Sequence, residues 1–160
     1  MKLKLPHTLP QKVLGVLSLL IVLLQFLLPL IFWSRLPDPL PTHYNSGGEV
    51  DGWGSRGTIF IMAGFSLFMW VFLDVINRID PRKWNIPFTV PWGREVQVYG
   101  AVKTMMAVMR LETVLIFAAS ELTTALCKGD WVLPIEGSLC VLMFITIAVG
   151  LWLAWRQRFR

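Results

Sequence analysis

The chain has 160 residues, of which 55% are hydrophobic and 16% are charged. A soluble domain of this size is usually about 45 to 50% apolar and about 25% charged, so an ordinary soluble globular domain is excluded. The net charge of +5 does not indicate nucleic-acid binding, because the cations stand in short groups at the ends of apolar runs. We therefore expect an integral membrane protein with the lipid bilayer as its surroundings and no nucleic-acid partner.

Four stretches of the chain are predicted to cross a bilayer. The first is uncharged from Val13 to Ser34. As a helix it reaches about 33 Å, which is enough for a hydrocarbon core of about 30 Å, and it is too long for the core of a signal peptide. We predict that residues 1–160 form one integral membrane domain, with spans at about 13–34, 57–76, 102–125 and 131–155.

The second and third spans carry charged residues that set them apart. The second uncharged run is short, which brings Asp74 close to the membrane boundary. The third is interrupted by Arg110 and Glu112, so we expect it to face the other helices more than the lipid. Residues 80–103, which join the two spans, combine prolines, tryptophans and cations and are expected to lie in the headgroup zone.

The distribution of basic residues predicts the orientation. Most Lys and Arg residues lie on the side of the two chain ends, whereas the other side holds only Arg35, Arg56 and Lys128. Segments rich in Lys and Arg stay in the cytoplasm. The predicted fold is an all-α bundle of four transmembrane helices, with both termini cytoplasmic and an ordered extracytoplasmic loop between the first two helices.

The loop between the first two spans, residues 35–56, has turn chemistry of its own. Alternating prolines keep its first part extended, and glycines permit sharp reversals in its second part. From Leu36 to Arg56 it reads LPDPLPTHYNSGGEVDGWGSR. This stretch is similar to the motif of a bacterial membrane family known as domain of unknown function 1648, which is allied to the Sdp-type immunity proteins. The matching positions are Leu36, Pro37, Pro41, His43, Tyr44, Gly48, Asp51, Gly52, Trp53, Gly54, Ser55 and Arg56.

The resemblance covers only the first part of the chain, and the later spans match by hydropathy alone. It implies a multi-pass protein of the bacterial cytoplasmic (inner) membrane. One branch of the family protects cells against an exported toxic peptide, but the resemblance assigns no functional residue within the motif.

His43, Glu49 and Asp51 are the candidate metal ligands of the loop. Their residue types suit a metal, but their spacing matches neither an EF-hand nor a zinc signature. The favoured interpretation is structural: Asp51 and Asn45 bond turn amides, while His43 packs on the outer end of the bundle. We predict no metal site.

Asp74, Arg110 and Glu112 are the candidate intramembrane charges. Such groups cost about 2.5 to 3.5 kcal/mol each on insertion scales and usually face the interior with a partner. Arg110 and Glu112 are two residues apart, so they point to different sides of one helix and need different partners. We hypothesise that Arg110 pairs with Asp74, and that Glu112 faces Lys12, Arg156 or a neighbouring subunit. A structural ion pair is favoured over a proton or ion path.

Enzyme signatures are absent from the sequence: it has no Gly-rich phosphate loop, no HExxH and no GxSxG. We predict a non-enzymatic small integral membrane protein that acts by helix–helix contact, as an accessory subunit of a larger membrane complex or as an immunity-type protein. Its partners would be other membrane protein subunits. The alternative is a small oligomeric transporter or channel that uses Arg110 and Glu112. No cofactor is predicted, and the sequence does not decide whether a lipid, pigment or quinone binds between the helices.

Overall fold

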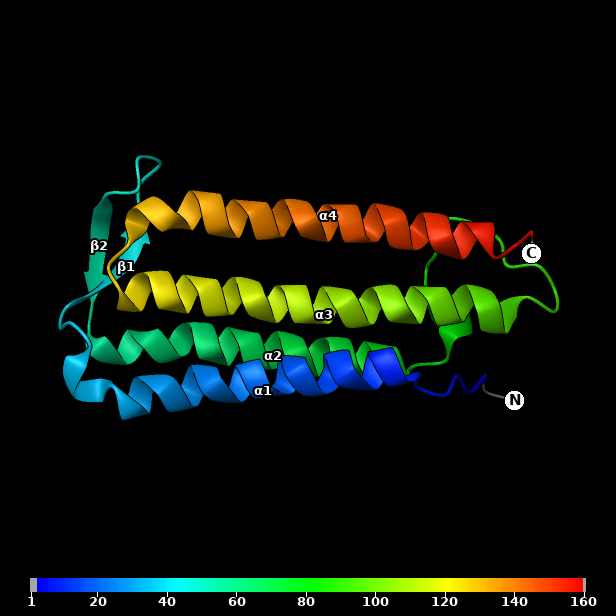
Figure 1. Ribbon diagram of the computed structural model, residues 1–160, viewed down its shortest axis with the longest axis horizontal. Coiled ribbons are helices and arrows are strands. Elements are labelled where there is room, and N and C mark those ends of the chain that lie inside the picture. Colours follow the sequence, from blue (N-terminus) through cyan, green and yellow to red (C-terminus); the bar gives the residue numbers. More distant parts are fainter. Residues whose placement is uncertain (1–2, 160) are drawn as a thin grey trace.

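The computed structural model describes residues 3–159, and within that range it has four long α-helices and one small sheet. The helices lie side by side, with the sheet against one end of the bundle and the first and last described residues at the other (Figure 1). These are the hairpin end and the terminal end. In chain order the elements are α1 (Leu9–Ile31), β1 (Leu40–Tyr44), β2 (Val50–Gly54), α2 (Ile59–Arg78), α3 (Glu95–Ala125) and α4 (Val132–Arg156).

The expected four helices are confirmed, but the all-α prediction is wrong for the loop between α1 and α2, which contains a β-hairpin. Strands β1 and β2 pair antiparallel, with Tyr44 opposite Val50. The Asn45 side chain fixes the turn, because its Oδ1 accepts from the Gly47 amide at 2.9 Å and from the Glu49 amide at 3.0 Å. Local side-chain bonds of this kind stabilise a reversal without any helix.

The hairpin is packed on the bundle rather than extended from it. Leu40 is fully buried in a small core with Leu36 and Ile59. On its other side the hairpin meets Gly129, just before α4. A Cβ added at Gly129 would clash with the Gly48 carbonyl oxygen, so only glycine fits at this position. The hairpin therefore connects the ends of α1 and α2 with the start of α4.

Helix α3 is the central helix of the bundle. Every residue from Val98 to Glu121 is buried or half-buried, and the helix contacts α1, α2 and α4. In the described part of the chain, three helical segments are long and apolar enough to span a membrane: Leu9–Ile31, Arg56–Arg78 and Gly129–Arg156. The charges of α3 keep it out of this group. Its burial agrees with the expectation that it faces the other helices more than lipid.

The bundle buries polar side chains among apolar ones and leaves large apolar side chains on its outside, unlike a typical soluble protein. On α1, Gln11, Ser18 and Gln25 are buried at heptad spacing, while Leu20 and Leu27 are 49% and 51% exposed. In water such a surface would be a large apolar patch, whereas lipid covers it without penalty and leaves polar side chains to bond between helices. The chain is a membrane protein.

Helix α3 begins at Glu95, earlier than the expected start near residue 102. Gly93 has a φ of 83° and ends the preceding turn, and Glu95 places a negative charge in the first turn of the helix, where the helix dipole favours it. Lys103, expected at the end of the connector, is instead inside the helix and 5% exposed. The shorter connector folds back over the terminal end of the bundle and packs Trp84, Ile86, Phe88 and Val90 against Val98, Val102 and Ala154.

Candidate functional site

An ion-pair network joins α2 and α3 inside the terminal half of the bundle. Arg110 Nη1 donates to Asp74 Oδ1 at 2.8 Å, and Arg78 Nε donates to Asp74 Oδ2 at 2.7 Å. The Arg110 side chain is 7% exposed and that of Asp74 is 21% exposed. The structure thus brings together Asp74 and Arg110, as hypothesised from the sequence. One carboxylate serves a buried guanidinium and an exposed one.

Arg110 is enclosed by α1 and α2. A Cβ added at Gly15 of α1 would lie 2.8 Å from Arg110 Nη2, and the guanidinium carbon lies 5.5 Å from the centre of the Trp70 ring. Trp70 Nε1 in turn donates to Ser18 Oγ at 3.0 Å. Close packing on both sides and a fixed counter-charge hold the guanidinium in one place. This arrangement fits a structural ion pair.

Glu112 lies on the other side of α3 and faces α4. Its Oε1 accepts from Thr146 Oγ1 at 2.6 Å, and its buried Oε2 has no hydrogen-bond partner within residues 3–159. The expected partners on this chain are wrong. Lys12 is exposed on α1, and the Arg156 guanidinium lies 5.5 Å from the centre of the Trp152 ring at the end of α4. The position of Glu112 around the axis of α3 directs its side chain to the middle of α4, out of reach of Lys12 and Arg156.

A crevice with a volume of about 530 Å³ lies between α1 and α3 in the hairpin half. Two buried polar side chains line it: Gln25 of α1, which is 4% exposed, and Glu121 of α3, which is 7% exposed. Gln25 Nε2 donates to the Val114 carbonyl at 3.2 Å, but Gln25 Oε1 and Glu121 Oε2 have no hydrogen-bond partner among the described residues. The apolar walls include Ile21, Leu24, Leu28, Ala118, Leu122 and Leu126.

Neither Gln25 nor Glu121 is among the site residues predicted from the sequence. A signal exists for Gln25, because it continues the heptad spacing of Gln11 and Ser18 along an apolar helix, and polar residues so spaced indicate a helix contact. Glu121 follows an apolar stretch and so resembles a charge that closes a span, but α3 continues beyond it to Ala125.

The loop-motif residues build the hairpin and do not converge on one site. Pro37 precedes β1, and Pro41 is buried in β1 opposite Trp53, which is 58% exposed. Arg56 fastens the far end of the hairpin, since its Nη1 donates to the Trp33 carbonyl at 3.2 Å and its guanidinium lies 5.4 Å from the centre of the Trp33 ring. These contacts hold the hairpin over the ends of α1 and α2.

His43 and Asp51 are hydrogen bonded to each other on the exposed face of the hairpin. The expectation that His43 packs on the bundle and that Asp51 bonds a turn amide is wrong, because the His43 side chain is 71% exposed and Asp51 faces it. The pairing of β1 with β2 is irregular on both sides of His43, which sits opposite Gly52. In the part of the chain that the structure describes, no group of three or more His, Cys, Asp or Glu side chains is placed to hold a metal ion.

The family match concerns this first part of the chain. Residues 20–67 match the model of the family described as Domain of unknown function (DUF1648). This segment is similar to the DUF1648 family. It extends from the middle of α1 through the hairpin into α2, and it contains the whole stretch from Leu36 to Arg56 that carries the resemblance. The predicted family is therefore confirmed, whereas the match does not extend to the Sdp-type immunity proteins. The DUF1648 segment also contains Gln25 and so supplies the α1 wall of the crevice.

A protein of Archaeoglobus fulgidus, described as uncharacterized, is similar to part of the chain. The two are 38% identical over 79 residues, a match that covers 44% of this chain and 43% of the relative. The chain therefore spans less than half the length of that relative. No solved structure matches.

Proposed function

We propose that the protein is a non-enzymatic membrane protein that acts by helix–helix contact, as an accessory subunit of a larger membrane complex. The proposed contact lies at the crevice between α1 and α3. The observation that carries the proposal is the pair of buried acceptors there, Glu121 Oε2 and Gln25 Oε1, neither of which has a partner in the described chain.

Unpartnered buried acceptors point to a missing donor. Each such group destabilises the isolated protein by about 1 to 3 kcal/mol. A neighbouring transmembrane helix can supply the donor from a Ser, Thr, Asn, Gln or Lys side chain, and bonds of this kind contribute to association within membranes. A partner with one of these residues would satisfy Glu121, Gln25 or both.

The crevice has the shape that a helix contact needs. Along α1 and the residue that follows it, the crevice extends from Ile21 to Phe32, which is about 17 Å at a rise of about 1.5 Å per residue. Leu24 and Leu28 on one wall and Leu122 on the other are 45%, 45% and 53% exposed. A transmembrane segment that packs along α1 and α3 would cover these leucines together.

The orientation is part of the proposal. The first and last described residues share one end of the bundle (Figure 1), and most of the cations belong to that end, while Arg35, Arg56 and Lys128 belong to the other. We assign the terminal end to the cytoplasm and the hairpin end to the outside of a bacterial cytoplasmic membrane. Helix α3 then crosses the bilayer as a fourth span among three apolar ones.

An immunity-type role would use the same crevice, with a membrane-active peptide in place of a subunit. Survival of a sensitive strain that expresses the protein, compared with one that expresses Glu121→Leu, separates this role from that of a subunit.

The competing function is a small oligomeric transporter or channel. Arg110 contacts Asp74 and the α1 side of the bundle, whereas Glu112 contacts Thr146 of α4. One path could not include both groups without crossing α3. We therefore expect proteoliposomes with the protein to show the same proton and ion flux as empty liposomes, and a flux abolished by Glu112→Gln would favour the transporter.

Site-specific photo-crosslinking tests the contact. We would place a photoreactive amino acid at Leu122, beside Glu121, and at Phe144 of α4 as a matched control, since these side chains are 53% and 69% exposed. Crosslinking in cells at Leu122 should give one protein adduct. The crosslinked position in the partner should map to a transmembrane segment that carries a hydrogen-bond donor. In a Glu121→Leu background the yield should fall about fivefold, the loss expected for one interhelical hydrogen bond.

The control defines failure. Equal adducts from Leu122 and Phe144, or lipid adducts alone at Leu122, would show that the crevice is covered by lipid and would overturn the proposal. A yield that does not change with Glu121→Leu would mean that the carboxyl group has no part in the contact.

A further inference from the structure

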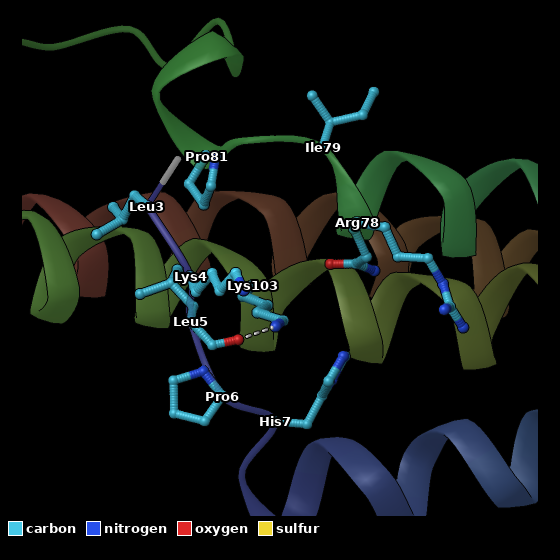
Figure 2. A pocket seen from close by; sticks show the side chains of 10 residues that line it. Leu3, Lys4, Leu5, Pro6, His7, Arg78, Ile79, Pro81 and Lys103 are labelled. Carbon is cyan, nitrogen blue, oxygen red and sulfur yellow. Dashed lines mark hydrogen bonds between the residues drawn. The ribbon is translucent and has the colours of Figure 1, made fainter. Parts of the chain in front are cut away.

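A second cavity, at the terminal end of the bundle, has a different character. It has a volume of about 440 Å³ and lies between the segment that precedes α1, the end of α2 and the start of the buried part of α3. Figure 2 shows the extended N-terminal segment passing over Lys103, with Pro81 close to Leu3 and Arg78 at the end of α2. Three separate parts of the chain therefore form one pocket.

The titratable side chains that line this pocket are all basic. They are Lys4, His7, Arg78 and Lys103, and the described lining contains no Asp or Glu. Two carboxylates lie close to the pocket: Asp80, which is paired with Arg82 and accepts a hydrogen bond from the Leu3 backbone, and Asp74, which is shared between Arg78 and Arg110. Positive charge therefore exceeds negative charge around the cavity.

Lys103 shows that the pocket is built and is not a loose surface patch. It is 5% exposed, and its Nζ donates to the Leu5 carbonyl at 2.8 Å, the bond drawn in Figure 2. An ammonium group has three donors, and a neutral carbonyl leaves its charge uncompensated. Asn77, another lining residue, is 8% exposed and its Oδ1 has no hydrogen-bond partner among residues 3–159. A side-chain amide can turn to present its NH₂ donors instead.

The electrostatic environment of His7 agrees with this distribution. Loss of solvation lowers the pKa of His7, Lys103 lowers it further, and Asp74 opposes them only in part. A positive potential therefore acts on the imidazole at the mouth of the pocket.

We propose that this pocket binds a phosphate group. Several donors around a positive cavity match the charge and the acceptor oxygens of a phosphate. The remaining lining is apolar, with Leu3, Leu5 and Ile79 beside the basic residues. Basic and apolar residues together at the end of a transmembrane bundle suit the headgroup and upper chain of an anionic lipid, and soluble phosphate is the other source of the same chemistry. The proposal does not depend on the partner proposed for the α1–α3 crevice.

The test uses the full chain in nanodiscs and reads the pKa of His7 by NMR. One sample contains phosphatidylcholine alone, a second also contains phosphatidylglycerol, and a third contains phosphatidylcholine with inorganic phosphate in the buffer. A bound phosphate should raise the pKa of His7. His43 lies at the opposite end of the bundle, where the second sample presents the same anionic lipid, so the shift of the His43 pKa measures the general surface effect. The expected result is a larger rise of the pKa for His7 than for His43.

Variants make the result specific. Lys4→Gln, which changes an exposed lysine of the pocket, should leave the fold intact and weaken lipid retention in native mass spectrometry about fivefold, the effect of one cation near an anionic headgroup. Lys128→Gln at the hairpin end is the matched control and should leave retention unchanged.

The outcomes separate the sources. A selective rise of the His7 pKa with phosphatidylglycerol assigns the site to a lipid, and a rise with inorganic phosphate alone assigns it to a soluble anion. No selective rise in either sample, or equal losses from Lys4→Gln and Lys128→Gln, would overturn the proposal.

Discussion

The two halves of this bundle treat buried charge in opposite ways. In the terminal half the buried cations have acceptors within the chain, Asp74 for Arg110 and the Leu5 carbonyl for Lys103. In the hairpin half the carboxyl groups of Glu112, Glu121 and Glu136 each leave one buried oxygen without a partner in the described chain.

Burial alone therefore does not identify a functional group. The charge of Arg110 is compensated within the chain, because Asp74 lies beside it and the Arg110 side chain is buried. The carboxyl group of Glu121 lines a crevice that opens to the side of the bundle, so a neighbouring helix can supply its missing partner.

Asp74→Leu should have the largest effect. It leaves Arg110, 7% exposed, without its counter-charge, and removal of one member of a buried pair costs about 3 to 5 kcal/mol. Unfolding in mixed detergent micelles measures the loss. Arg78→Gln is the control, because the Arg78 side chain is 73% exposed and an exposed pair contributes about 1 kcal/mol or less.

The double variant Asp74→Arg with Arg110→Asp should recover part of the stability that each single swap removes. Equal losses in the double and single variants would mean that the charges act independently.

Gly129→Ala should destabilise the protein by about 1 to 3 kcal/mol, the usual cost of forcing an extra carbon into a packed contact. The new Cβ would meet the Gly48 carbonyl oxygen and the Tyr44 ring, so the hairpin must move away from α4. Protease sensitivity at the Asn45–Glu49 turn should rise together with the loss of thermal stability. Gly137→Ala, where an added Cβ meets nothing within 4 Å, is the control: it should leave protease sensitivity unchanged and should not lower thermal stability, because alanine favours the helix.

Glu121→Leu should stabilise the isolated protein by about 1 to 3 kcal/mol, because it removes a buried polar atom that lacks a partner. The same change should weaken partner capture at Leu122, so stability and function move in opposite directions. Glu121→Gln keeps an unpartnered polar group and should gain less. A loss of stability on Glu121→Leu would show that the carboxyl group is already satisfied in the isolated chain.

Asp80→Asn should have the smallest effect and should show it only in the pH dependence. The hydrogen bond from Arg82 lowers the pKa of Asp80 below its ordinary value of 3.8, and loss of solvation opposes this only in part. A carboxylate whose pKa is lower in the folded state stabilises the fold above its unfolded pKa and loses that contribution as pH falls through the folded pKa. Wild type should therefore melt slightly above Asp80→Asn near neutral pH, and the gap should close as pH falls below about 3.8. A gap that widens in acid would contradict this sign.

The patterns that could be predicted from the sequence are those with a local physical cause. Uncharged runs longer than a bilayer is thick indicate helices, and the Pro- and Gly-containing stretch from Leu36 to Arg56 was enough to identify the family. The pairing of Arg110 with Asp74 also followed from local reasoning, since a charge at membrane depth requires a partner and Asp74 lies at the edge of a short span.

Other features required the folded chain. Strands β1 and β2 were not predicted, because the hairpin depends on pairing between the two strands and on packing contacts with the bundle, at Gly129 and through Leu40. For Glu112 the predicted partners are Lys12, Arg156 or a neighbouring subunit, whereas within the described chain its Oε1 accepts from the hydroxyl group of Thr146, which periodicity along α3 does not reveal.

By itself, the sequence determined that this protein belongs in a membrane, that it is built mainly from four helices and that it contains a DUF1648 segment, because hydropathy, chain length and a short motif are properties of neighbouring residues. Only the tertiary structure decided which buried polar atoms find partners and which do not. That property belongs to pairs of residues far apart in the chain, such as Gln25 on α1 and Glu121 on α3, and it appears only when the helices are packed together.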